Sequence, residues 1–146
     1  MTARRERILN RVADVLEALG YTFMRNRADV VESKCPYVIL LDGDETSATP
    51  DDNSPSNRRS PSAPQVMLLN PEIWIVEHEG IDNPGTALNE KRDEILEALF
   101  GDSELLGLLH NLGIRYEGCA TAFRAGRHLT GEMGLNVTLA YVHRII

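Results

Sequence analysis

The sequence predicts an α+β fold, with a mixed or antiparallel sheet of about five strands and two or three helices packed on it. Two observations predict this class. Apolar residues recur at helical spacing near the N-terminus and again in the second half of the chain, whereas the segments between and after them alternate as strands do. The order is therefore one helix, three strands, one or two helices and two strands. A length of 146 residues is that of a single domain, residues 1–146, with a core of its own.

The first predicted helix runs from Thr2 to Leu19, and Gly20 follows it as a C-terminal cap. Its apolar positions recur at steps of three and four residues, at Ile8, Leu9, Val12, Val15, Leu16 and Leu19. Its arginines lie largely on the opposite side of the helix, where they form a solvated surface or a binding surface for an anionic partner. A first strand, Tyr21–Asn26, leaves the helix by a tight turn.

A second strand, Tyr37–Leu41, is short and continuously apolar, so we expect it to be buried on both faces. We expect it to end in a turn at Asp42–Glu45. The following segment, residues 46–64, is rich in proline and serine and contains too few apolar residues to offset the entropy of ordering it. The composition predicts a flexible insert, which projects as an arm between two paired strands.

The central strand of the fold is predicted at Val66–Glu79, which contains the only tryptophan, Trp74. Apolar residues occupy both faces of this strand, which is typical of a strand interior to a sheet. The even-numbered face carries Val66, Leu68, Trp74 and Val76, and the odd-numbered face carries Met67, Leu69, Ile73 and Ile75. Pro71 lacks a backbone donor, so it predicts a bulge or an edge midway along the strand.

Asn83 and Pro84 predict the N-terminus of a second helix that continues to Gly101. Ser103 is expected to cap a shorter helix, Glu104–Leu112. Strand character returns at 114–123, and residues 124–134 have the glycine and charge content of a long hairpin tip. The final strand, 135–146, is one-sided: four alternate residues are expected to face the core, namely Leu135, Val137, Leu139 and Tyr141.

The balance of charge is acidic, with 22 Asp and Glu against 15 Lys and Arg and a formal net charge of −7. A dedicated binder of duplex nucleic acid needs a basic surface, so this balance argues against one. The two cysteines, Cys35 and Cys119, are expected to be reduced and buried. No apolar stretch is long enough for a bilayer, and the N-terminus has no signal-peptide pattern, so we expect no membrane association.

Residue spacing predicts no catalytic site, no metal and no cofactor. The carboxylates around Asp42 and Asp44 lack the spacing of a calcium loop, and the four histidines show no ligand spacing. Glu90 and Lys91 resemble part of a two-carboxylate nuclease motif, but that motif requires a strand, and here the pair lies in a predicted helix. We therefore expect a protein that is not an enzyme. A small metal-dependent phosphodiesterase is the alternative from another functional class.

Charged residues gather where the predicted strands end, and loops on a rigid scaffold are where binding residues concentrate. We expect these residues to form subunit or partner contacts, because opposite charges across an interface set its register. The candidates are Arg25, Arg27 and Asp29 after the first strand, Asp42, Asp44 and Glu45 after the second, Arg58 and Arg59 in the insert, and Arg124, Arg127, His128 and Glu132 in the hairpin tip.

Several segments together resemble the tail terminator proteins of long-tailed bacteriophages and related tail-like particles. They are RNRADV at 25–30, PYVILLDGD at 36–44, NPE at 70–72, LNEKRDEILEALFGDSELLGLL at 88–109, IRYEGC at 114–119 and GEMGLNVTLAYVHR at 131–144. The resemblance covers most of the chain and is weakest in the insert. Its motifs are structural, and the pairing of IRYEGC with GEMGL is the most specific of them.

The resemblance implies an assembly role in the virion, at the neck of the tail. Such proteins form a homo-hexameric ring that caps the tail tube, stops its polymerisation and provides the docking surface for the head completion or connector protein. DNA passes through the lumen without specific binding, and an acidic lining would repel its phosphates. The alternative within the same particle is another neck or tail-tube subunit.

Overall fold

The computed structural model describes residues 3–27, 36–48, 64–77, 83–111, 113–125 and 129–143, and at residues 123–125 and 129–130 it describes the backbone alone. Within these ranges the chain forms three helices and five strands. In chain order these are α1 (Arg4–Glu17), β1 (Thr22–Arg25), β2 (Tyr37–Ser47), β3 (Gln65–Glu77), α2 (Pro84–Phe100), α3 (Ser103–Leu108), β4 (Ile114–Ala125) and β5 (Leu129–His143). The predicted α+β class, the five-stranded mixed sheet and the order of elements are confirmed.

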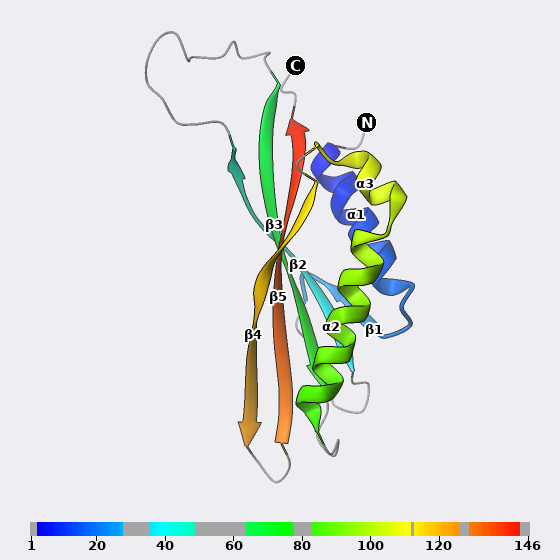
Figure 1. The fold of residues 1–146 in the computed structure, drawn as a ribbon, viewed down its shortest axis with the longest axis vertical. Helices are drawn as coiled ribbons and strands as arrows, with labels where there is room; N and C mark the ends of the chain where they lie inside the picture. Colours follow the sequence, from blue (N-terminus) through cyan, green and yellow to red (C-terminus); the bar gives the residue numbers. More distant parts are fainter. Residues whose placement is uncertain are drawn as a thin grey trace.

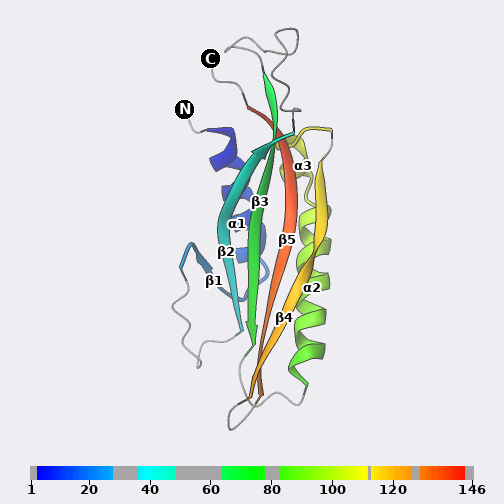
Figure 2. The ribbon, with the colours of Figure 1, turned by 90° about the vertical axis from the view of Figure 1, so that its left-hand side faces the viewer.

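One sheet contains all five strands, in the order β1-β2-β3-β5-β4 (Figures 1 and 2). The short β1 pairs with β2 in parallel, and every other neighbouring pair is antiparallel. The long strand β3 therefore lies in the middle of the sheet, as its two apolar faces predict. Its partner β5 comes from the far end of the sequence, with Gln65 opposite His143 and Glu77 opposite Gly131.

All three helices lie on the same side of the sheet, which leaves the opposite side without a helix (Figure 1). The predicted inward residues of α1 are buried, with Ile8 and Leu16 fully so. They pack with Leu88, Ile95 and Leu99 of α2 and with the odd-numbered residues of β3 and β5. The core consequently lies between the helices and one sheet face. The four residues predicted to face inward from the last strand, Leu135, Val137, Leu139 and Tyr141, are all buried.

The turn predicted at Asp42–Glu45 is wrong, because β2 continues through these residues to Ser47. The ladder with β3 instead slips by one residue, since Leu41 lies opposite Glu72 but Asp44 lies opposite Asn70. This β-bulge depends on Gly43, whose φ is +74°. A Cβ at Gly43 would lie 1.9 Å from the carbonyl oxygen of Asn70, so only glycine fits there.

Pro71 lies in an interior strand, so the bulge and not the edge is the correct alternative of the two predicted for it. The extra residue belongs to the partner strand β2, directly across from Asn70 and Pro71. The missing backbone donor of proline is thus accommodated where the ladder is already interrupted.

The long hairpin tip predicted at residues 124–134 is also wrong in extent. β4 continues to Ala125 and β5 begins at Leu129, so most of the segment is paired strand. Glycines and charges favour a loop by composition, but Gly134 pairs with Trp74 within the β3–β5 ladder and Gly131 pairs with Glu77 at its end. At position 134 a Cβ would lie 3.1 Å from the Trp74 ring, so any larger residue would require the ring to shift by a few tenths of an ångström.

The start of α2 follows the prediction, with Asn83 Oδ1 accepting a hydrogen bond from the Thr86 amide and Pro84 in the first turn. The N-terminal cap of α3 differs from the prediction. Asp102, and not Ser103, accepts from the Leu105 amide, and α3 ends at Leu108, four residues before the predicted end at Leu112. Of the two predicted buried thiols, Cys119 is exposed, which contradicts the prediction, and Cys35 lies outside the described residues.

Candidate functional site: the open face of the sheet and the α1–α3 cleft

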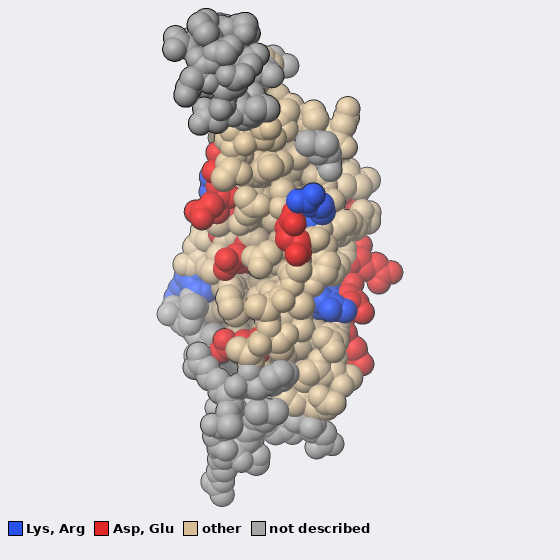
Figure 3. All heavy atoms as spheres, turned by 60° about the vertical axis from the view of Figure 1, so that its left-hand side comes forward, with Lys and Arg blue, Asp and Glu red and all other residues tan. Residues whose placement is uncertain are grey.

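The side of the sheet that carries no helix, called the open face below, is formed by the even-numbered residues of β3 and their cross-strand partners. Register places Trp74 beside Ile39 of β2 and Gly134 of β5 on this face. Charged side chains are sparse on it, and the space-filling view from this side is mostly uncharged (Figure 3). Among the described residues, register assigns the charged side chains of Asp44, Glu72, Arg115 and Glu132 to this face, and Glu117 joins them through its contact with Thr138.

Trp74 packs its ring over the backbone of β5 at the middle of the open face. Its Cζ2 atom is 3.1 Å from the position that a Cβ of residue 134 would take, so the ring covers the Gly134 backbone. The indole Nε1 donates to Glu72 Oε2 at 3.1 Å. The tryptophan is only partly buried and its donor is satisfied, which is a common state for an aromatic anchor at an interface.

A polar cluster lies next to Trp74 on the open face. The Thr138 hydroxyl lies 2.9 Å from Asn70 Oδ1 and 2.8 Å from Glu117 Oε1, and its one proton serves one acceptor at a time. Arg115 Nε donates to Glu117 Oε1 at 2.7 Å. These contacts lower the pKa of Glu117, the Arg115 hydrogen bond most and the Thr138 hydrogen bond next, so the carboxylate stays charged near neutral pH.

A shallow pocket of about 210 Å³ lies beside this cluster, at the end of the sheet where β2 and β5 finish. Small residues form much of it, and its lining is Ala48, Leu68, Gly113, Arg115, Thr138 and Ala140. The segment after α3 is hydrogen-bonded to this part of the sheet: the His110 amide donates to the Ala140 carbonyl, and the Ala140 amide donates to the Gly113 carbonyl. The pocket and α3 therefore lie at the same level of the molecule, on opposite sides of the sheet.

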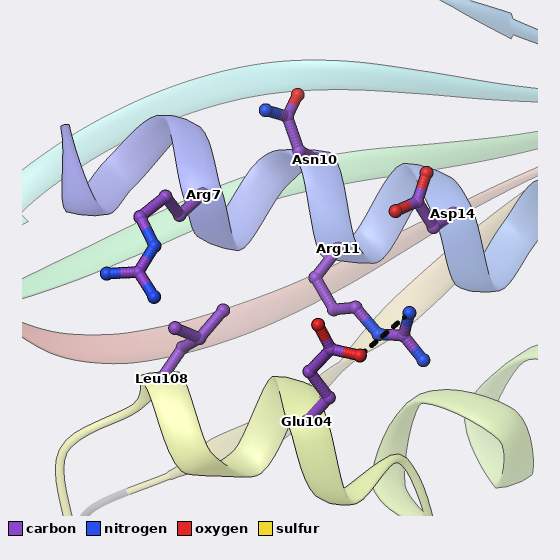
Figure 4. Close-up of a pocket in the computed structure, with 6 residues that line it drawn as sticks. All are labelled: Arg7, Asn10, Arg11, Asp14, Glu104 and Leu108. Carbon is purple, nitrogen blue, oxygen red and sulfur yellow. Dashed lines mark ion pairs between the residues drawn. The ribbon is translucent and has the colours of Figure 1, made fainter. Parts of the chain in front are cut away.

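The second cavity is a cleft of about 290 Å³ between α1 and α3, lined by Arg7, Asn10, Arg11, Asp14, Glu104 and Leu108 (Figure 4). Arg11 is held in place by two carboxylates. It donates to both oxygens of Asp102, at 2.8 and 2.7 Å, and lies 3.1 Å from Glu104. The hydrogen bonds from Arg11 hold the pKa of Asp102 below its usual value.

Arg7 projects over the same cleft toward Leu108 (Figure 4). Within the described part of the chain, neither Arg7 nor the exposed Arg4 forms an ion pair. The arginine surface predicted on α1 is thus divided. Arg11 and Arg5 serve the fold, the latter by donating to the Gly43 carbonyl at 3.1 Å, whereas Arg4 and Arg7 are available to another molecule.

The predicted interface residues are brought together only in part. Arg25 and Asp42 form a paired contact with Nε–Oδ1 and Nη2–Oδ2 distances of 2.9 and 3.1 Å, and Arg25 also pairs with Glu6 at 3.0 Å. These contacts join α1, β1 and β2 of one subunit, and the Arg25 hydrogen bond lowers the pKa of Asp42. Glu45 accepts from the Tyr141 hydroxyl, on the helix side of the sheet.

Arg27 and Asp44 are exposed, and Glu132 is partly exposed on the open face. Glu132 lies far from Asp44 and Glu45, because it pairs with Val76 and they pair with Asn70 and Leu69. Arg124 is described by its backbone in β4 alone. The other candidates lie outside the described residues: Asp29, Arg58, Arg59, Arg127 and His128. Their role in an interface stays a prediction.

Lys91, one of the two residues considered above for nuclease chemistry, forms an ion pair inside the protein. The Nζ atom of Lys91 lies 2.7 Å from Oε2 of Glu77, and the Glu77 side chain is buried, with 1% of its surface exposed. Lys91 therefore joins α2 to β3. Over the described residues, no three His, Cys, Asp or Glu side chains lie close enough to share a metal ion. No helix in that part of the chain has the length and hydropathy to cross a membrane.

A comparison with known proteins finds no family model that matches the sequence and no curated protein that matches it. Sequence reasoning did not find the pocket beside Ala140 or the Arg11–Asp102 contact. One local signal of the pocket exists, since the alternation that turns Leu139 and Tyr141 inward leaves the small residues Thr138 and Ala140 on the opposite face, where they leave a hollow. The contact between residues 91 positions apart leaves no local signal.

Proposed function

We propose that this protein is a structural subunit of a phage tail or a related tail-like particle, and that it acts as the tail terminator. In this role a ring of subunits caps the tail tube, stops its polymerisation and offers a surface to the head connector. The observation that carries the proposal is the one-sided sheet. Three helices cover one side, and the other side exposes partly buried apolar residues around Trp74 with few charges.

A subunit with two unlike sides suits a heterologous contact, in which one surface meets a different surface of the next copy. Repeated with a constant rotation, such a contact closes into a ring. The segment resemblance to tail terminators supports the same role, and most of its segments lie in the sheet and in the helix layer. The acidic balance of the chain also fits a lumen through which DNA slides without binding.

The proposal is tested by adding the purified chain to polymerising tail-tube protein of the same particle and measuring tube lengths by electron microscopy. We expect shorter tubes with a ring at one end and no further growth after capping. Particles assembled without the chain should have overlong tails and no attached heads.

Two results would contradict the proposal in different ways. Incorporation along the whole tube would identify a tube subunit, and binding to the head connector without any binding to tubes would identify another neck protein. A mutant chain with an exposed charge on the solvent side of α2, Glu97→Gln, serves as the matched control and should cap tubes normally.

A further inference from the structure

The helix layer carries an apolar patch that is out of place on a free surface. Among the described residues, the two exposed large hydrophobic side chains are Phe100 at the end of α2, 39% exposed, and Leu106 in α3, 41% exposed. They lie on either side of the connection between the two helices. Single exposed apolar residues are ordinary, but these two lie six residues apart at the same corner of the helix layer, and we call them the patch.

The pocket on the open face has the complementary character. Its small lining residues and Leu68 leave a hollow of about 210 Å³, large enough for an apolar side chain. The hydrogen bonds from His110 and to Gly113 place the pocket residue Ala140 level with the end of α3. Because α3 lies on the helix side of the sheet (Figure 1) and the pocket lies on the open face, the two surfaces are at one height on opposite sides of the subunit.

The charges around the two surfaces are also complementary. Arg4 and Arg7 are exposed on α1, which packs against α3 at the patch end of the helix layer. The open face near the pocket carries the carboxylates of Glu117, Glu72 and Asp44 against the single guanidinium of Arg115, so among the described residues acidic groups prevail there. Opposite charges on the two sides favour a head-to-tail approach of two copies and disfavour an approach of like sides.

We infer that the Leu106–Phe100 patch of one copy inserts into the pocket lined by Ala48, Leu68 and Ala140 on the open face of the next copy. This inference rests on the proposed function and names the surfaces that close its ring. Since the patch and the pocket are level, successive copies stand side by side with their long axes roughly parallel, which is the arrangement that a ring requires.

The test uses one variant on each side of the contact. Leu106→Glu places a charge in the patch, and Ala48→Trp fills the pocket at an exposed position at the end of β2. Each should raise the dissociation constant for self-association at least about tenfold, the effect of losing a central apolar anchor. Asn89→Glu, an exposed position in the first half of α2, and Ala122→Trp at the other end of the open face are the matched controls, and both should assemble normally.

Mixing the two variants gives the decisive result, measured by native mass spectrometry at raised concentration and on tail tubes. The Leu106→Glu chain retains its pocket and the Ala48→Trp chain retains its patch, so the mixture should form a one-to-one dimer that grows no further. Rings formed by either variant alone, or a mixture that stays monomeric, would overturn the inference.

These outcomes are distinct from a failure of the proposed function. If the unmodified chain neither assembles nor caps tubes, the terminator role fails, and the ring contact fails with it. If the unmodified chain caps tubes and both variants do so equally well, the role stands and the Leu106–Ala48 contact is wrong.

Discussion

At Gly43, we expect the addition of a single methyl group to cause a large loss of stability. A methyl group there would need a left-handed backbone and would also meet the Asn70 carbonyl at 1.9 Å. We predict that Gly43→Ala lowers the free energy of unfolding by at least about 2 kcal/mol. Urea denaturation of the variant and the unmodified protein measures this difference in the free energy of unfolding.

The control is Gly107→Ala, because Gly107 lies in α3 with nothing within 4 Å of its Cβ position. Alanine is the better helix former, so this variant should gain up to about 1 kcal/mol. Equal stability of the two variants would mean that the bulge at Gly43 relaxes without cost.

Asp102 has two separate tasks at the start of α3: it caps the helix and it pairs with Arg11. Asp102→Asn keeps the capping acceptor and removes the charge. Because the folded-state pKa of Asp102 is lowered, the pairing stabilises the fold above the unfolded pKa of about 3.9 and is lost as the pH falls through the folded pKa.

We therefore predict that Asp102→Asn is less stable than the unmodified protein at neutral pH and that the difference shrinks in acid. Chemical denaturation at several pH values measures it. A difference that stays constant from neutral pH to below the folded pKa would show that the charge of Asp102 contributes nothing to stability.

At the scale of elements, the buried ion pair between Glu77 and Lys91 fixes α2 against β3. Glu77 is 1% exposed, so removing Lys91 takes away a cation that lies 2.7 Å from a carboxylate in the core. We predict that Lys91→Met costs about 3–5 kcal/mol of stability.

The double variant Glu77→Leu with Lys91→Met should recover most of that loss, because an apolar pair of similar size removes the buried charge altogether. Thermal and urea unfolding of the single and double variants measure the coupling. If the double variant is no better than the single one, the pair contributes through shape and not through charge.

The connection between β2 and β3 is a second test at this scale. The Ala48 amide donates to the Val66 carbonyl at 2.9 Å, so the two strands are paired up to the point where residues 49–63 join them. We predict that replacing 49–63 by a short Gly-Ser turn leaves the unfolding midpoint nearly unchanged, since the cost of loop closure varies slowly with length. A large loss of stability would show that the insert contributes to the core.

The elements that the sequence predicts well are those whose signals are local. The Asn83–Pro84 cap, the apolar spacing of α1 and the alternation of β5 each require only their neighbours in sequence. The local composition of Asp42–Glu45 predicts a turn. The segment is nevertheless part of a strand, because Asn70 across the sheet accommodates the bulge at Gly43. The candidate surfaces depend in the same way on pairings between distant segments, which is why the pocket at Ala140 and the cleft at Arg11 were not predicted.

At the scale of the whole molecule, the two unlike sides of the sheet lead to a prediction about salt. If Arg4 and Arg7 of one copy approach the carboxylates of the next, ionic strength should slow self-association. We predict that Arg4→Gln with Arg7→Gln lowers the association rate and removes most of its salt dependence, with no loss of melting temperature, because neither side chain forms an ion pair within the described part of the chain.

Stopped-flow light scattering at several salt concentrations measures this rate. Arg92→Gln is the control midway along α2, where Arg92 pairs with its neighbour Asp93. An unchanged salt dependence in the double variant would place the attractive charges elsewhere on the surface.

The position of β5 in the sheet has a consequence for how the chain acquires its structure. This strand follows all the others in sequence, yet it lies between β3 and β4 and is hydrogen-bonded to both. A nascent chain that ends before Leu129 contains β3 without one of its two neighbours and β4 without its only partner. The sheet therefore closes only after residues through His143 have left the ribosome, and pairings over such long sequence separations form slowly. During synthesis, the exposed edges of β3 and β4 are the places where a chaperone would bind.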